Sequence, residues 1–259
     1  MKKMFAQERQ KIILDKLVQQ NSITIKELAT SLNVSEATLR TDLTKLEQQN
    51  LLRRTHGGAI LVDTDEHETS FSTRQLKNKT EKNAIARAAL QTISDNQSIM
   101  LDASSTALEL AHCLKDFNHR LTVVTSGLKV AMELSDSPNI TVILIGGIVK
   151  QGSNSLEGTL GAEILDKIHV DRLFTSANGF SKDAGFTDFS VYEVELKKRM
   201  VQAAKKVTAL LDHTKINRSS IAAFASIADI DTFITDEPVS EDYFDLFQTY
   251  NVELIVAKK

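Results

Sequence analysis

The sequence has a single cysteine among its 259 residues and no long apolar run. With Cys113 alone, neither an intrachain disulfide nor a metal site built on cysteines can form. A membrane-spanning helix needs about 20 consecutive apolar residues, and no stretch approaches that length. The two lysines near the N-terminus are not followed by the apolar run of a signal peptide. These absences predict a cytoplasmic protein.

The chain as a whole has no excess of positive charge, since its formal net charge is −3. The first 60 residues nevertheless hold ten basic and six acidic side chains, a net charge of +4, so the remaining 199 residues carry −7. A basic N-terminal part on an acidic body is expected where only that part meets phosphates. The length suits two domains, and the 42% hydrophobic and 25% charged fractions are those of a globular protein.

The first sixty residues predict three short helices. The first covers residues 8–20 and has one apolar face at helical spacing. The second begins after Thr24, which forms a capping box with Glu27. After a turn of three or four residues, Ser35 caps a third helix with a polar and basic outer face. This order indicates a helix-turn-helix, whose second helix enters the major groove of DNA.

Two β-prone runs flank Gly57-Gly58 and predict a hairpin beside the third helix, as in a winged helix-turn-helix. Arg40 could bind a guanine edge or hold a phosphate, and the sequence leaves both open. A solvated surface charge remains the alternative for each arginine, and a three-helix protein-binding module for the whole domain. The candidate DNA-binding residues are Thr24, Ser35, Glu36, Ala37, Thr38, Arg40, Thr41, Lys45, Arg53, Arg54 and His56.

The remaining chain predicts a linker and a second domain. Residues 63–80 are polar and of mixed charge, which separates a DNA-binding domain over 1–62 from a domain over 81–259. In the second domain, apolar runs alternate with helical patterns, which indicates an α/β fold with a doubly wound, mostly parallel sheet covered on both faces. The expected strands cover 98–102, 121–125, 140–147, 171–176, 206–212, 232–235 and 253–256.

Small polar residues follow these strands, at the edge where parallel sheets bind ligands. Hydroxyls and the N–H groups of a helix N-terminus suit an anion, a lysine adds charge, and a carboxylate can accept sugar hydroxyls. Such residues also cap helices routinely, and Glu193 with Lys197 could be a surface ion pair. The candidate effector-binding residues are Asp102, Ser104, Ser105, Thr106, Thr125, Ser126, Gly146, Gly147, Lys150, Asn178, Gly179, Glu193, Lys197, Asp212 and Lys215.

Three segments resemble the DeoR family of bacterial repressors: FAQER at residues 5–9, VSEATLRTDL at 34–43 and LLRRTHGGA at 51–59. The family usually has a second arginine at the position of Thr41. The second domain resembles the DeoR sensor domain, whose fold is similar to that of ribose-5-phosphate isomerase and glucosamine-6-phosphate deaminase. The resemblance implies a repressor of a sugar-metabolism operon that binds double-stranded operator DNA as a homodimer or homotetramer and responds to a phosphorylated sugar.

The same resemblance implies a phosphate loop at Asp102 and Ser104–Thr106, where the family often has a glycine in place of Ser104. The alternatives are a sugar-phosphate isomerase or deaminase fused to a DNA-binding domain, and an activator that responds to another metabolite. The related isomerases carry an acidic cluster after the fourth strand, whereas this chain has no carboxylate there before Asp183. We therefore expect no catalytic residue, no cofactor and no metal site.

Overall fold

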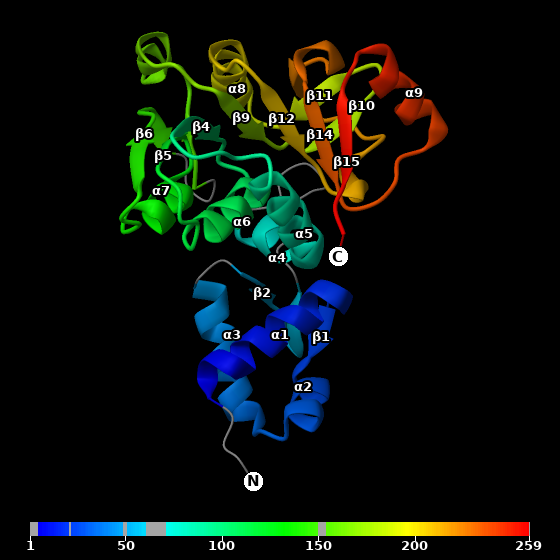
Figure 1. Ribbon diagram of the computed structural model, residues 1–259. Helices are drawn as coiled ribbons and strands as arrows, with labels where there is room; N and C mark the ends of the chain where they lie inside the picture. The colour runs from blue at the N-terminus through cyan, green and yellow to red at the C-terminus, as the bar shows by residue number, and fades with distance from the viewer. Residues whose placement is uncertain (1–4, 21, 49–50, 61–70, 150–153, 259) are drawn as a thin grey trace. The chain divides into compact units, whose positions relative to one another are not determined.

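The computed structural model describes residues 5–20, 22–48, 51–60, 71–149 and 154–258 (Figure 1). The chain forms two compact units, Met1–Lys77 and Asn78–Lys259. The fold class predicted from the sequence is confirmed: the first unit is a winged helix-turn-helix and the second is an α/β unit with a parallel sheet. None of the helices in the described ranges is long and apolar enough to cross a membrane.

The N-terminal unit contains the three predicted helices, α1 (Ala6–Gln20), α2 (Ile25–Leu32) and α3 (Glu36–Gln48). The predicted hairpin is formed by β2 (Arg53–Arg54) and β3 (Gly58–Ile60). A short strand that was not predicted, β1 (Ser22–Thr24), pairs antiparallel with β3. Three residues are too few to show an alternating pattern, so only the tertiary pairing defines β1 as a strand.

The ends of α2 follow from local chemistry. The backbone N–H of Glu27 donates to Thr24 Oγ1 at 3.2 Å, and the backbone N–H of Thr24 donates to Glu27 Oε2 at 2.9 Å, which is the predicted capping box. Asn33 ends the helix in the left-handed conformation, with φ 51°. The capping box fixes where α2 begins, and Asn33 fixes where it ends, so that α3 can begin after it.

Gly58 brings β3 close to β1. A Cβ atom at this position would lie 2.0 Å from the backbone oxygen of Ile23. Only glycine therefore permits the pairing that attaches the hairpin to the strand before α2.

The predicted linker is partly helical. Residues 71–76 form α4 (Phe71–Leu76), with Phe71 buried and Leu76 packed against the core of the N-terminal unit. The guanidinium of Arg74 lies 5.9 Å from the centre of the Phe71 ring. Two apolar residues in one short polar segment gave too weak a pattern to predict this turn of helix, and residues 61–70 lie outside the described residues.

The C-terminal unit is built on a seven-stranded parallel sheet of order β15-β14-β12-β9-β4-β5-β6. From β4 the chain winds outward to β5 and β6, and from β9 it winds the other way to β12, β14 and β15, so the order reverses between β4 and β9. All seven strands were predicted to within a few residues. They are β4 (Gln97–Leu101), β5 (Leu121–Thr125), β6 (Ile140–Leu144), β9 (Arg172–Thr175), β12 (Val207–Leu210), β14 (Thr232–Thr235) and β15 (Glu253–Val256).

Helices cover both faces of this sheet (Figure 1). The crossover helices α6 and α7 lie on one face of the sheet, and α8 and α9 lie on the other, as right-handed crossovers require when the two halves of the sheet are wound in opposite directions. Helix α5, which precedes β4, packs beside α6. The helices are α5 (Lys79–Leu90), α6 (Ser105–Leu114), α7 (Leu128–Leu134), α8 (Val191–Ala203) and α9 (Glu241–Thr249).

Two small antiparallel sheets were not predicted. One contains β10 (Gly179–Ser181), β11 (Gly185–Asp188) and β13 (Ala222–Ala225), and the other contains β7 (Ile148–Val149) and β8 (Leu156–Glu157). Every residue of β11 is buried, so this strand has no polar face that could show an alternating pattern. The hairpin of β10 and β11 carries its chain back toward the end of β9, and this return shapes the candidate site.

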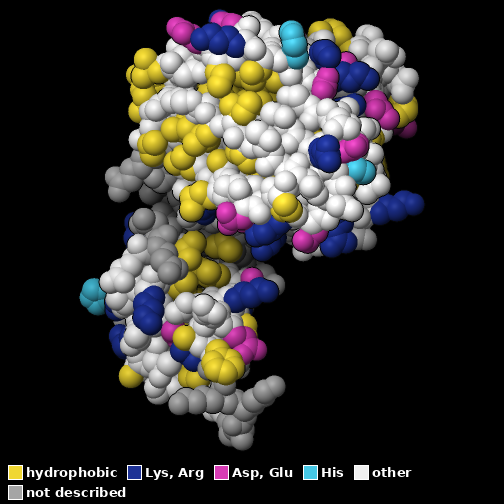
Figure 2. Space-filling view, turned by 60° about the vertical axis from the view of Figure 1, so that its left-hand side comes forward, with side chains coloured by type: hydrophobic (Ala, Val, Ile, Leu, Met, Phe, Trp, Pro, Cys, Tyr) yellow, Lys and Arg dark blue, Asp and Glu magenta, His cyan; other side chains and the backbone are white. Residues whose placement is uncertain are grey.

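The edge of the large sheet at β6 exposes apolar side chains. Leu144, at the end of edge strand β6, and the neighbouring Ile148 and Val149 are exposed. Figure 2 shows hydrophobic side chains gathered on the side of the C-terminal unit that comes forward in this view, which is the side of β6. Patches of this kind often mark interaction surfaces.

Candidate functional site

The outer face of α3 presents the predicted DNA-binding side chains to solvent. Ala37, Arg40 and Lys45 are exposed. The guanidinium of Arg40 lies 3.6 Å from the carboxylate of Glu36, one helical turn earlier, and both side chains are about half exposed. An exposed pair of this kind is weak, so Arg40 can exchange Glu36 for a base edge or a phosphate.

Several of the predicted hydroxyl contacts have structural roles. Thr24 and Ser35 cap helices, and Ser35 Oγ accepts from the backbone N–H of Thr38 at 3.2 Å. The hydroxyl of Thr41 donates to the backbone oxygen of Ala37 at 3.1 Å. Thr24 thus sets where α2 begins, Ser35 sets where α3 begins, and Thr41 bonds within α3, so a contact to DNA would be additional to these roles.

The hairpin is tied to α3 through Arg54. Its side chain donates to Thr44 Oγ1 at 2.6 Å, and its backbone N–H donates to Glu47 Oε1 at 2.8 Å. Arg53 and His56 are exposed. Arg54 therefore positions the wing, while Arg53 and His56 are the wing side chains that face solvent.

A buried ion pair positions the reading helix against the helix α1. Asp42, on the inner face of α3, pairs with Arg9 of α1 and also accepts from Gln10 Nε2 at 3.1 Å. Arg9 and Asp42 are both almost fully buried. This pair was not predicted from the sequence, because two charges 33 positions apart give no local signal.

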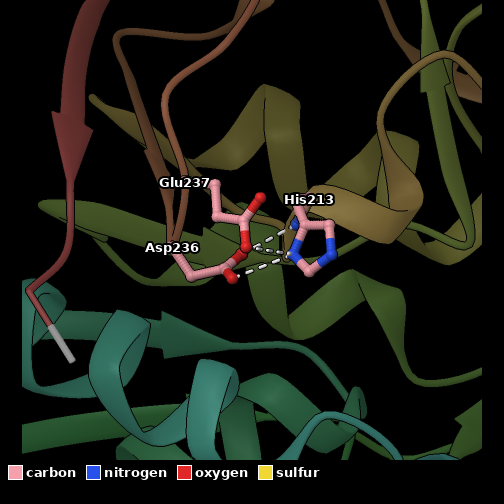
Figure 3. A group of neighbouring side chains, drawn as sticks. All are labelled: His213, Asp236 and Glu237. Carbon is pink, nitrogen blue, oxygen red and sulfur yellow. Dashed lines mark hydrogen bonds and ion pairs between the residues drawn. The ribbon is translucent and has the colours of Figure 1, made fainter.

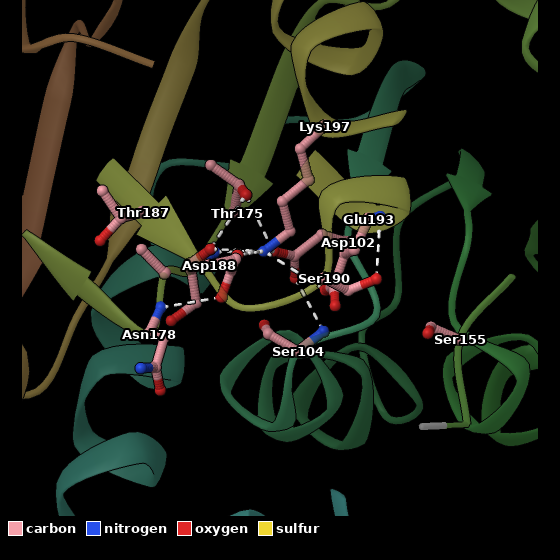
Figure 4. Close-up of polar contacts among 12 residues, drawn as sticks. Asp102, Ser104, Ser155, Thr175, Asn178, Thr187, Asp188, Ser190, Glu193 and Lys197 are labelled. Atoms are coloured by element: carbon pink, nitrogen blue, oxygen red, sulfur yellow. Dashed lines mark hydrogen bonds and ion pairs between the residues drawn. The ribbon is translucent and has the colours of Figure 1, made fainter. Parts of the chain in front are cut away.

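In the C-terminal unit, the loops after β4 and β9 meet where the strand order reverses (Figure 4). Asp102 Oδ1 accepts the backbone N–H of Ser104 at 3.0 Å. Asp102 Oδ2 accepts the hydroxyl of Thr175 and the backbone N–H of Ser176, each at 2.8 Å. Ser104 Oγ in turn accepts the N–H of Ala107 and caps α6. Asp102 thus joins both loops from a fully buried position.

Lys197 of α8 points into the same place (Figure 4). Its Nζ lies 2.6 Å from Asp188 Oδ2, 3.1 Å from Asp102 Oδ2 and 3.6 Å from Glu193 Oε1, and it donates to the backbone oxygen of Ser176 at 2.8 Å. Only 4% of the Lys197 side chain is exposed. The surface ion pair that the sequence left open for Glu193 and Lys197 is therefore wrong, because the lysine lies in the interior.

Asp102 and Lys197 stabilise each other's charged form. Burial alone raises the pKa of Asp102, but the Lys197 charge and the hydrogen bonds from Ser104 and Ser176 outweigh it and hold that pKa below its usual value. Burial alone lowers the pKa of Lys197, and the charges of Asp102, Asp188 and Glu193 raise it well above the ordinary lysine value. General acid–base catalysis needs a pKa near the working pH, and neither group has one.

Asp188 was not among the predicted site residues. It ends β11, and the β10–β11 hairpin brings it beneath Lys197, while its Oδ1 accepts the backbone N–H of Asn178 at 3.0 Å. Glu157 was also missed: it is buried and accepts hydroxyl hydrogens from Ser155 at 3.2 Å and from Ser190, the cap of α8, at 2.7 Å. The sequence signal that could have pointed to Asp188 is its position two residues before Ser190, the residue that caps α8.

The loops after β5 and β6 shape the candidate site mainly through contacts of their backbone atoms. Thr125 Oγ1 accepts the N–H of Gly127 at 3.0 Å, and the backbone oxygen of Ser126 accepts the N–H of Leu156 at 2.8 Å. A Cβ atom on Gly147 would lie 2.7 Å from the backbone oxygen of Glu157, so this glycine permits a close approach of two chain segments. A Cβ atom on Gly161 would lie 2.3 Å from the backbone oxygen of Gly146, whereas one on Gly146 would make an ordinary contact with Gly161. The predicted residue Lys150 lies outside the described residues.

The remaining predicted residues lie at the same edge of the sheet. Lys215 Nζ donates to the backbone oxygen of Ala177, in the loop after β9, at 3.2 Å. Asp212 Oδ1 accepts Asn78 Nδ2 at 3.0 Å and the N–H of Thr214 at 3.2 Å. Ser105 and Thr106, in the first turn of α6, and Gly179 are buried, whereas Asn178 is half-buried.

Two family models match the chain. The DeoR-like helix-turn-helix domain matches residues 9–65, and the DeoR C terminal sensor domain matches residues 77–237. The HTH-type transcriptional regulator GolR of Listeria innocua is 46% identical over 98% of this chain and 100% of its own length. The HTH-type transcriptional repressor GlcR of Bacillus subtilis is 37% identical over 99% of this chain and 98% of its own.

A relative with a different printed role is the L-fucose operon activator of Haemophilus influenzae, 31% identical over 90% of this chain and 93% of its own. Among solved structures, ribose 5 phosphate isomerase A from Neisseria gonorrhoeae matches 53% of each chain with 15% identity and a TM-score of 0.40. That likeness is too weak to support an argument about activity.

Proposed function

Since this chain belongs to the DeoR family of transcriptional regulators, we propose that it represses a sugar-metabolism operon and that a phosphorylated sugar bound in the C-terminal unit controls its affinity for DNA. It is a regulator rather than an enzyme, as its relatives are. One observation carries the effector proposal: in the unit matched by the sensor-domain model, the loops after β4 and β9 converge where the strand order of the sheet reverses. That place is the usual ligand site of open α/β sheets.

We assign one set of residues to the phosphate of the effector and another to its sugar hydroxyls. The first turn of α6, at Ser105 and Thr106, presents the main-chain N–H groups that a helix cannot satisfy internally, which suits a phosphate. Lys215, at the same edge, adds a positive charge. Glu193 is the most exposed carboxylate of the Lys197 cluster, with 15% of its side chain accessible, and we assign it to the sugar hydroxyls.

Asp102 and Lys197 are assigned a different role from the one that the sequence predicted. Both oxygens of Asp102 already accept hydrogen bonds, and Lys197 already faces three carboxylates and a carbonyl. We propose that the two residues position the effector loops without contacting the effector.

Control of DNA binding follows from linkage. An effector lowers operator affinity only by as much as it prefers the state that binds DNA poorly. We expect the repressor to act in the cytoplasm as a homodimer or homotetramer, and the exposed apolar edge at β6 supports association. The relative named as an activator makes transcriptional activation the second candidate function. The effector site would be the same, but the protein would raise transcription of the operon where a repressor lowers it.

A thermal-shift screen tests the effector proposal. One phosphorylated sugar should raise the unfolding temperature of the purified protein while its unphosphorylated parent does not, because a ligand that binds only the folded state stabilises it by mass action. Lys215→Gln should weaken that ligand by about 1.5–3 kcal/mol, which is roughly tenfold or more in Kd, through loss of a charged contact.

The matched control is Lys206→Gln, which removes an exposed lysine just before β12. It should leave the effector affinity unchanged. Equal stabilisation by a phosphorylated sugar and its parent, or no stabilisation by any sugar phosphate, would contradict the effector proposal and leave the DNA-binding proposal intact.

Arg40→Ala should lower operator affinity by about 1–3 kcal/mol if Arg40 reads a base. Fluorescence anisotropy on operator and non-operator DNA separates the two possible contacts. A base contact predicts a loss confined to the operator, whereas a phosphate contact predicts an equal loss on both DNAs and a salt dependence that is smaller by about one ion. Unchanged affinity on both DNAs would remove Arg40 from the DNA-binding surface.

A further inference from the structure

The connection between the two units is short, and Asn78 lies at its end. Helix α4 ends at Leu76, which packs against the core of the N-terminal unit, and α5 begins at Lys79. The N-terminal unit extends to Lys77, and the C-terminal unit begins with Asn78. Any movement that passes along the backbone from one unit to the other therefore passes through Asn78.

The side chain of Asn78 does not cap the helix that it precedes. Asn78 is the N-cap residue of α5, with a left-handed φ of 52°, but its side chain accepts no N–H from the helix. An asparagine N-cap normally stabilises its helix through such a bond. The Asn78 amide instead donates from Nδ2 to Asp212 Oδ1 at 3.0 Å and to Thr214 Oγ1 at 3.1 Å. It thus makes a contact to a residue 134 positions away in place of a local one.

This contact reaches a loop of the proposed effector site. Asp212 follows β12 and caps the short helix η2 (His213–Lys215), and residues 212–215 together are called the η2 segment here. Lys215, the last residue of the segment, is the lysine that we assign to the effector phosphate. Thr214, one of the two residues that Asn78 contacts, is therefore the direct neighbour of a proposed effector contact.

The carboxylate of Asp212 is held through one of its oxygens. Oδ1 accepts the backbone N–H of Thr214 at 3.2 Å and also the Thr214 hydroxyl, in addition to the Asn78 amide. Oδ2 is buried and has no hydrogen-bond partner within the described ranges. Over those same ranges, Asn78 is the only donor to this carboxylate from outside the η2 segment. A shift of Asp212 or Thr214 would therefore change the bonds that hold the first residue of the C-terminal unit.

The first residue of η2 is fixed to the sheet (Figure 3). The backbone N–H of His213 donates to Asp236 Oδ1 at 2.8 Å, and His213 Nδ1 lies 2.9 Å from Asp236 Oδ2. Asp236 follows β14 and is buried. The segment is thus anchored at His213, while the following residues, Thr214 and Lys215, contact Asn78 and the loop after β9. A ligand bound at Lys215 would pull on the end of the segment that carries Thr214.

We propose that Asn78 couples the effector site to the DNA-binding unit through its hydrogen bonds to Asp212 and Thr214. This coupling rests on the proposed function, because it gives the route by which a bound effector changes DNA affinity. An effector that moves Lys215 changes these hydrogen bonds and, with them, the backbone position from which the N-terminal unit continues. Coupling between two sites is reciprocal, so DNA bound to the N-terminal unit should in turn change how the η2 segment is held.

Hydrogen–deuterium exchange of the full chain, with and without DNA, tests this reciprocal effect. The probe is a DNA duplex that the protein itself selects from a random-sequence pool, used at a saturating concentration for each variant. The readout is the exchange of the backbone amides of Thr214 and Lys215, both of which donate to Asp212. In the wild type, the duplex should change their exchange rates at least about fivefold, the low end of coupling between allosteric sites.

Two substitutions of Asn78 should abolish this response to DNA. Asn78→Gly removes the side chain and tolerates the left-handed backbone. Asn78→Asp keeps the size of the side chain but replaces the amide donor with a carboxylate, which cannot donate to Asp212 and repels it. The matched control is Asn96→Gly, at another left-handed asparagine of the C-terminal unit, with φ 62°, whose amide donates to the neighbouring Asp95 at 2.8 Å. It should respond to DNA as the wild type does.

Circular dichroism checks that each variant is folded. Equal exchange of the η2 segment with and without the duplex in the wild type would overturn the proposal, and so would a wild-type response in Asn78→Gly and Asn78→Asp. An equal loss of the response in Asn96→Gly would also overturn it, because the effect would then not depend on the contact with Asp212 and Thr214. The experiment contains no sugar, so a failed thermal-shift screen would count against the effector proposal alone.

Discussion

Lys197→Met should destabilise the C-terminal unit by about 3–5 kcal/mol, the range for removing one partner of a buried ion pair. Lys197 is the positive charge that faces Asp102, Asp188 and Glu193, and two of these carboxylates are almost fully buried. Without the lysine, Asp102 after β4 and Asp188 at the end of β11 would be buried carboxylates that have lost this counter-charge. The repulsion should also loosen the proposed effector site, so effector binding should fall with stability.

The measurement is urea unfolding followed by tyrosine fluorescence. All three tyrosines, Tyr192, Tyr243 and Tyr250, lie in the C-terminal unit, so their signal reports on that unit alone. The matched control is Lys198→Met, at the next position of α8, where the lysine pairs with Glu195 at 2.8 Å on the surface. Exposed ion pairs contribute about 0–1 kcal/mol to the free energy of unfolding. A Lys197→Met effect as small as that of the control would show that the cluster is not a closed ion-pair network.

Asp42→Asn should destabilise the N-terminal unit by a similar amount, about 3–5 kcal/mol, because it leaves Arg9 charged and buried without its carboxylate. The pair holds α3 against α1, and the side chains proposed to contact DNA project from the other face of α3. Operator affinity should therefore fall as well, although the substituted side chain lies on the inner face of the helix and would touch no DNA.

Far-UV circular dichroism detects this change, and the tyrosine transition should stay where it is in the wild type because the C-terminal unit is untouched. Glu36→Gln serves as the matched control for stability alone, since it removes an exposed carboxylate from the same helix. An Asp42→Asn protein as stable as the wild type would mean that Arg9 finds solvent or another partner at little cost.

The regular elements of both units were predictable because their signals are local. The seven strands of the large sheet are continuous apolar runs, and Thr24, Ser35 and Ser104 lie where helices begin. The unpredicted elements are short or lack alternation, such as β1 and the fully buried β11. Helix α4 lay in a segment whose polar composition suggested only a linker.

The sequence was enough to predict where the candidate sites lie, but it predicted fewer of the contacts that their side chains make. The strand pattern was enough to collect Asp102, Ser104, Asp212 and Lys215 at one edge of the sheet, since parallel strands end together. It did not show that Asp102 is saturated by hydrogen bonds. Nor did it show that Asp188 lies under Lys197, because that contact depends on the return of the β10–β11 hairpin.

The sequence by itself determined the helix-turn-helix, the doubly wound parallel sheet and the family, because caps, apolar periodicity and motif residues act over a few neighbouring positions. Only the tertiary structure decided which charges are buried and which partners they have. Arg9 with Asp42, Lys197 with Asp102 and His213 with Asp236 are separated by tens of residues or lie on different elements. Burial and Coulomb interactions depend on distance in space, and that distance is set by how the strands and helices pack.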